Sequence, residues 1–131
     1  MNAPEAFELF KIPDGKEKVE CSLDERTLHT ATFTILLEDH TLGNIVKMML
    51  LRNPKVRFAA YRKPHPLENK IEIKIQTNGA ITPSAALKEA LSNLSQDLDD
   101  CYREFEEELK NYIQWLFYIM FFYLWIKLSK L

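Results

Sequence analysis

The feature that most constrains the fold is a heptad pattern in the second half of the chain. Thr82-Pro83 is typical of a helix start, because the hydroxyl can cap the first turn and proline fits the first helical position. Apolar residues then follow at spacings of four and three: Leu87, Leu91, Leu94, Leu98, Cys101 and Phe105. This a/d pattern predicts a helix over 83–110, about 42 Å long at roughly 1.5 Å per residue. Its second half, from Leu98, runs beyond the reach of a small sheet and predicts contact with a partner.

Shorter patterns precede this helix. Alternating residues rich in Thr, Phe, Val and Ile predict strands over 18–23, 31–37, 56–61 and 70–77. A first amphipathic helix, capped by Asp39 or Thr41 and ended by Pro54, is indicated by Leu42, Ile45, Val46, Met49 and Leu50. The order β-β-α-β-β-α predicts an α+β fold with a small four-stranded sheet, one short helix and one long C-terminal helix.

The faces of the last two strands can be predicted from the same alternation. Over 70–77, Ile71, Ile73 and Ile75 should share one face. Over 56–61, one face should hold Val56, Phe58 and Ala60, and the opposite face Arg57, Ala59 and Tyr61.

Composition excludes several classes of protein. The chain has 131 residues, of which 47% are hydrophobic, so a single folded domain is expected rather than a disordered chain. Its two cysteines, Cys21 and Cys101, are too far apart in sequence for a metal-binding motif, which is typical of a reduced intracellular protein. No secretory signal opens the chain.

Catalytic and metal-binding motifs are weak. Glu38-Asp39-His40-Thr41 could orient a general base, but no Ser or Cys nucleophile accompanies it, and a helix cap explains it more simply. His29 and His65 could each bind a metal, yet neither has a Cys or His partner at a typical spacing. We therefore predict no catalytic residue, no metal and no cofactor.

Two further features leave alternatives open. Residues 41–77 carry eight Lys or Arg and two Asp or Glu, which suits either phosphates or, more simply, a solvated sheet face or an acidic partner. Gly43 costs its helix about 1 kcal/mol relative to alanine, so either another helix backbone approaches it closely or it is a surface glycine.

Several motifs together resemble the family of small alpha-like subunits of multisubunit RNA polymerases. They are Glu38–Asn44, Val56–Tyr61, His65–Glu68 and Ile75–Thr77. The family includes archaeal subunit L and a subunit shared by polymerases I and III, and the opening residues 1–10 resemble its RNA polymerase II branch. The resemblance covers residues 1 to about 110.

The resemblance implies a noncatalytic nuclear subunit that pairs with a larger alpha-like partner, the third subunit in RNA polymerase II, to form the platform for the largest subunits. DNA would be met only through the whole complex. Pairing in the family uses the first and last helices. The implied interface is Leu42, Gly43, Ile45, Val46, Met49, Leu50, Leu87, Leu91, Leu94, Leu98, Cys101 and Phe105, and the implied docking arm is Phe7, Leu9 and Phe10 within residues 1–17.

The C-terminal segment departs from the family. Residues 112–126 include one polar residue other than tyrosine and tryptophan, Gln114, whereas family members end in a polar segment. Four interpretations remain: an added partner-binding helix end, a tail anchor, a membrane insertion, and a translation artefact. A helix of this length spans about 22 Å against a hydrocarbon core of roughly 30 Å, so a membrane role is disfavoured. We expect a domain over 1–110 and an atypical tail over 111–131.

Overall fold

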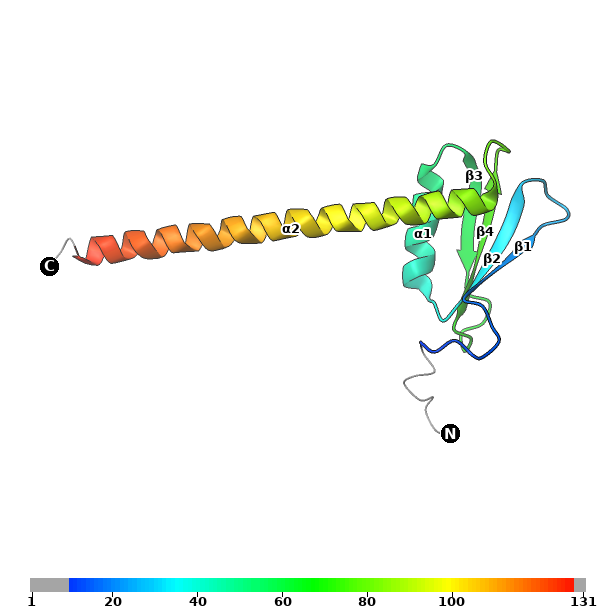
Figure 1. Cartoon of the computed structure of the whole chain (residues 1–131), viewed down its shortest axis with the longest axis horizontal. Coiled ribbons are helices and arrows are strands. Elements are labelled where there is room, and N and C mark those ends of the chain that lie inside the picture. Colours follow the sequence, from blue (N-terminus) through cyan, green and yellow to red (C-terminus); the bar gives the residue numbers. More distant parts are fainter. Residues whose placement is uncertain (1–9, 129–131) are drawn as a thin grey trace, which may run out of the picture. The chain divides into compact units, whose positions relative to one another are not determined.

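The computed structural model describes residues 10–128, with side chains described through residue 122. Its elements are β1 (Val19–Leu23), β2 (Thr30–Leu36), α1 (His40–Arg52), β3 (Val56–Arg62), β4 (Lys70–Thr77) and α2 (Pro83–Leu128). The strands form one antiparallel sheet in the order β1-β2-β4-β3 (Figure 1). The α+β fold and the element order predicted from the sequence are therefore confirmed.

The core lies on one face of β2 and β4, the two central strands. Ile71, Ile73 and Ile75 of β4 are fully buried, as their alternation predicts. Phe33 and Ile35 lie opposite Ile73 and Ile71 in the antiparallel register. Cross-strand apolar pairs of this kind are the main stabilising unit of a sheet whose other face is in water.

Helix α1 begins and ends as its sequence predicts. The Asp39 carboxylate accepts a hydrogen bond from the Thr41 backbone N–H at 2.9 Å, so Asp39 is the N-cap. This hydrogen bond to the charged form holds the pKa of Asp39 below its usual range. The helix ends at Arg52, two residues before Pro54.

Strand β3 differs from its predicted alternation. A bulge interrupts its pairing with β4 between Val56 and Phe58. A bulge adds one residue to a strand, and every later side chain then points to the other face. Ala59 is consequently buried with Val56, whereas Phe58 is 47% exposed. The prediction that Phe58 shares the face of Val56 is wrong for this reason.

Helix α2 continues beyond the predicted end at Lys110, through Leu128. No glycine or proline interrupts the sequence after Pro83, so nothing in it stops the helix. Its start is as predicted, because the Thr82 hydroxyl accepts a hydrogen bond from the Ala85 N–H at 3.2 Å. The chain divides into two compact units between Leu94 and Ser95.

Candidate protein–protein interface

Helix α1 has two apolar faces, of which only one belongs to the core. Val46, Met49 and Leu50 are buried in the core of the first unit, and Leu42 packs against that core. Ile45, Met48 and Leu51 are spaced three residues apart and are 39%, 52% and 50% exposed. The sequence pattern identifies Ile45 but misses Met48 and Leu51, because a second apolar stripe is difficult to separate from the first by periodicity.

Gly43 is buried against an aromatic ring of the same chain. A Cβ atom at this position would lie 2.4 Å from Cδ2 of Tyr61 on β3. Lys47 lies over the same ring at 5.7 Å from its centroid, and His40 Nδ1 lies 3.3 Å from the Tyr61 hydroxyl. Within the first unit, the close neighbour that requires glycine is therefore a tyrosine side chain and not a second helix backbone.

The start of α2 divides its predicted stripe between core and surface. Leu87 and Leu94 are 7% and 9% exposed and belong to the core of the first unit, together with Ala86 and Ala90. Leu91 is 43% exposed. Leu91 is thus the residue of the first-unit stripe that offers apolar surface to another molecule.

In the second unit the stripe is exposed. Leu98 and Phe105 are 57% and 66% exposed, and Cys101 is a free exposed cysteine. Tyr102, which the heptad pattern does not include, is 63% exposed beside them. Six of the twelve expected interface residues can therefore present surface to a partner: Leu98, Cys101, Phe105, Ile45, Leu91 and the half-buried Leu42. The other six are buried.

The groups suggested as catalytic have structural roles. Besides the Asp39 cap and the His40–Tyr61 contact, Glu38 forms an ion pair with Lys18 at 2.7 Å. Within residues 10–128, no group of three or more His, Cys, Asp or Glu side chains could hold a metal ion.

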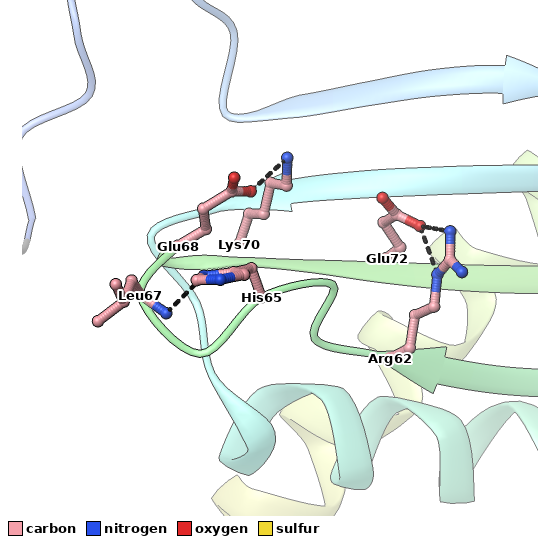
Figure 2. Close-up of polar contacts among 6 residues, drawn as sticks. All are labelled: Arg62, His65, Leu67, Glu68, Lys70 and Glu72. Carbon is pink, nitrogen blue, oxygen red and sulfur yellow. Dashed lines mark hydrogen bonds and ion pairs between the residues drawn. The ribbon is translucent and has the colours of Figure 1, made fainter.

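The turn between β3 and β4 is ordered by its own side chains (Figure 2). His65 Nδ1 accepts a hydrogen bond from the Leu67 N–H at 3.1 Å, and Glu68 pairs with Lys70 at 2.7 Å. This pair lowers the pKa of Glu68 and raises that of Lys70. His65 therefore shapes a turn, and it leaves Leu67 86% exposed.

Part of the basic segment over 41–77 is paired with carboxylates. Arg62 contacts Glu72 across β3 and β4, with both Nη2 and Nε within 2.8 Å of one carboxylate oxygen (Figure 2). Lys74 Nζ donates to Asp24 at 2.7 Å and thereby lowers the pKa of Asp24. These pairs reduce the positive charge available to phosphates and support the interpretation as a solvated sheet face.

The C-terminal segment is exposed as far as its side chains are described. Between Tyr112 and Phe122, ten large apolar or aromatic side chains are each between 45% and 70% exposed. No helix in the part of the chain that the structure describes is long and apolar enough to cross a bilayer. Of the predicted docking arm, Phe10 is 75% exposed, while Phe7 and Leu9 lie outside the described residues.

A helix packed on one face of a small antiparallel sheet, with exposed apolar side chains on both helices, is typical of a protein-association domain. Residues 30–104 match the family model of the RNA polymerase Rpb3/Rpb11 dimerisation domain. The chain belongs to this family, as its motifs indicate.

Relatives and a solved structure agree with this assignment. The chain is 41% identical over 110 residues to DNA-directed RNA polymerase II subunit rpb11 of Dictyostelium discoideum, covering 84% of this chain and 92% of that protein. It is 44% identical to a probable RNA polymerase II subunit RPB11 of Caenorhabditis briggsae, covering 87% and 93%. The fold matches subunit L of Thermoplasma acidophilum RNA polymerase with a TM-score of 0.59 at 22% identity, over 73% of this chain and 94% of that one.

Proposed function

We propose that this chain is a noncatalytic assembly subunit of RNA polymerase II that pairs with the larger, alpha-like third subunit. The pair would form the platform on which the largest subunits assemble, in the nucleus. The observation that carries the proposal is the exposure of two apolar side chains in the dimerisation region. Leu98 lies within residues 30–104, which match the dimerisation domain, and Phe105 directly follows them. Relatives named as RNA polymerase II subunits favour this polymerase over polymerases I and III.

The proposed mechanism is burial of apolar surface between helices. Ile45, Met48 and Leu51 of α1 and Leu91 of α2 form the first-unit part of the interface, and Leu98, Cys101 and Phe105 form the second-unit part. Removing such side chains from water supplies most of the association free energy in interfaces of this kind. Residues 1–110 would form the polymerase domain, with 1–17 as a docking arm that includes Phe10.

A single charge in the exposed stripe tests the proposal. Leu98→Asp should weaken binding of the full chain to the third subunit by about a hundredfold, because burying an apolar leucine stabilises by about 1.5–3 kcal/mol and a buried unpaired carboxylate is unfavourable. Gln96→Asp is the matched control, since it adds the same charge at an exposed position off the stripe. Binding is measured by titration of the co-expressed and separated subunits.

Two results would contradict the proposal. One is co-purification of the Leu98→Asp variant with the third subunit at the yield of the Gln96→Asp control. The other is recovery of the unmodified chain with the largest subunit of polymerase I or III instead of polymerase II, as identified by mass spectrometry of the purified complex.

A further inference from the structure

The C-terminal part of α2 has a second apolar face, opposite the stripe. Beyond Phe105 the stripe continues at spacings of four and three: Leu109, Tyr112, Leu116 and Ile119. Four further residues, at i, i+3, i+4 and i+7, lie on the other side of the helix and form the back face: Gln114, Phe117, Tyr118 and Phe121. The three aromatic side chains of the back face are 57%, 69% and 70% exposed.

The same side of the helix is polar and charged in the preceding turns. Residues at spacings of four, three and four follow it there: Gln96, Asp100, Arg103 and Glu107. A helix with one apolar stripe and a charged opposite side faces water on that side, whereas a helix that is apolar all round is normally buried. A partner helix that lies along the stripe cannot reach the back face. Another surface is therefore needed to cover Phe117, Tyr118 and Phe121.

The chemistry of the back face suits a surface of the same kind. Residues 111–122 contain no charged residue, so two copies of the segment can meet without repulsion. Aromatic rings pair favourably with one another, as Tyr112 and Trp115 do within the chain at 6.3 Å between ring centroids. An anionic membrane surface is disfavoured, because residues 97–108 of the same helix hold seven Asp or Glu and one Arg.

The exposed area is sufficient for a pair of helices. A large aromatic side chain buries about 150–250 Å², so each of the three exposed rings leaves about 100–150 Å² to be covered. With Ile113 and Phe122, which border the back face, each copy offers roughly 600 Å². A pair would then bury about 1,200 Å² in total, the lower limit for a specific, stable interface.

We propose that the back face pairs with the back face of a second copy of this chain, as two antiparallel helices centred between Phe117 and Tyr118. Phe117 of each copy then lies against Tyr118 of the other, and Gln114 lies against Phe121. Such a two-fold symmetric interface uses the same patch on both copies. The pairing goes beyond the proposed function, because it leaves Leu98 and the rest of the stripe available to the third subunit.

The acidic segment favours the antiparallel direction. At about 1.5 Å per residue, the two copies of Glu107 would be about 31 Å apart along the helix axis, well beyond the screening length of about 8 Å at physiological salt. A parallel pair would instead place the two acidic segments, residues 97–108, side by side. Like charges in that position would weaken the pair.

A charged pair placed on the back face tests the inference. Phe117→Glu with Phe121→Lys leaves the net charge unchanged and supports the helix, because Glu four residues before Lys is favourable. Tyr112→Glu with Leu116→Lys is the matched control, since it places the same pair at the same spacing on the stripe. Self-association of the full chain is measured by sedimentation equilibrium, after circular dichroism has shown equal helix content.

The unmodified chain should form dimers with a dissociation constant in the micromolar range. The back-face variant should dimerise at least about a hundredfold more weakly, because each copy loses two aromatic contacts and gains two charges in the interface. The stripe variant should stay within about twofold of the unmodified chain.

Three results would overturn the inference and leave binding to the third subunit as a separate question. The first is a monomeric unmodified chain. The second is an equal loss of self-association in both variants, which indicates unspecific aggregation. The third is flotation of the unmodified chain with phosphatidylcholine vesicles in place of dimer formation, since a membrane would then cover the back face.

Cross-linking tests the direction of the pair. With Cys21 and Cys101 replaced by serine, Gln114→Cys chains and Phe121→Cys chains are oxidised by copper phenanthroline, separately and mixed. Only the mixture should form disulfides, because identical cysteines of an antiparallel pair lie about 10 Å apart along the axis, beyond the Cα–Cα limit of about 7 Å. Disulfides in the separate samples, and none between the two kinds of chain, would contradict the antiparallel pairing.

Discussion

Gly43 offers the sharpest test of how the first unit is packed. An alanine at this position would place its Cβ 2.4 Å from Cδ2 and 2.8 Å from Cε2 of Tyr61. Atoms cannot approach so closely, and Tyr61 therefore has to move. Its ring also lies beneath Lys47 and beside His40, so the displacement disturbs those contacts too.

Two opposing effects determine how Gly43→Ala changes the free energy of unfolding. Alanine stabilises a helix interior by about 1 kcal/mol relative to glycine. Forcing extra volume into a packed site costs about 1–3 kcal/mol. The overpacking is the larger effect here, because the clash is with the rigid ring of Tyr61 and not with the end of a flexible side chain. We expect the free energy of unfolding to fall by about 1 kcal/mol.

A second substitution, at Tyr61, separates the two effects on stability. In a Tyr61→Ala background the obstructing ring atoms are absent, and Gly43→Ala should then stabilise the chain by up to about 1 kcal/mol. The change of sign corresponds to a coupling free energy of about 2 kcal/mol between the two positions, within the range for residues in contact. Asn44→Ala, at the next and exposed helix position, is the control for helix propensity alone.

The assay must report on the sheet. Both tryptophans, Trp115 and Trp125, lie beyond the first unit, so their fluorescence does not follow its unfolding. Hydrogen exchange of the β4 backbone amides in increasing urea measures the opening of the strand that carries Ile71, Ile73 and Ile75. If Gly43→Ala stabilises the chain equally with and without the Tyr61 ring, that ring does not restrict the side chain at position 43.

Two further predictions concern acid stability and the tail. The lowered pKa of Asp39, caused first by the Thr41 N–H, means that its contribution is present above the usual value of 3.8 and is lost as the pH falls below it. Asp39→Asn keeps a capping oxygen but does not titrate, and its stability should therefore decline less steeply below pH 4 in urea titrations; equal slopes would disprove this. Ending the chain after Lys110 removes exposed aromatic side chains such as Trp115 and Phe121, and light scattering should show less aggregation with unchanged binding to the third subunit. A tail that contributes to the interface would instead weaken binding when removed.

Several parts of the fold could be predicted because the signals were local. The Asp39 cap, the Thr82-Pro83 helix start and the alternation of Ile71, Ile73 and Ile75 each depend on residues a few positions apart. The bulge in β3 could not be predicted, since it is defined by pairing with β4. Phe58 consequently faces solvent although its spacing from Val56 suggests a shared face.

In the candidate interface, too, the sequence predicts some features and only the folded structure defines others. The sequence by itself determined that two helices carry apolar stripes, because spacing along a helix sets which residues share a face. Only the tertiary structure decided which apolar residues are already used: Val46 and Leu87 are buried in the core, whereas Met48 and Leu98 are exposed. Burial depends on which surfaces meet after the chain folds, and a stripe of leucines has the same pattern whether the sheet of its own chain or a second subunit covers it.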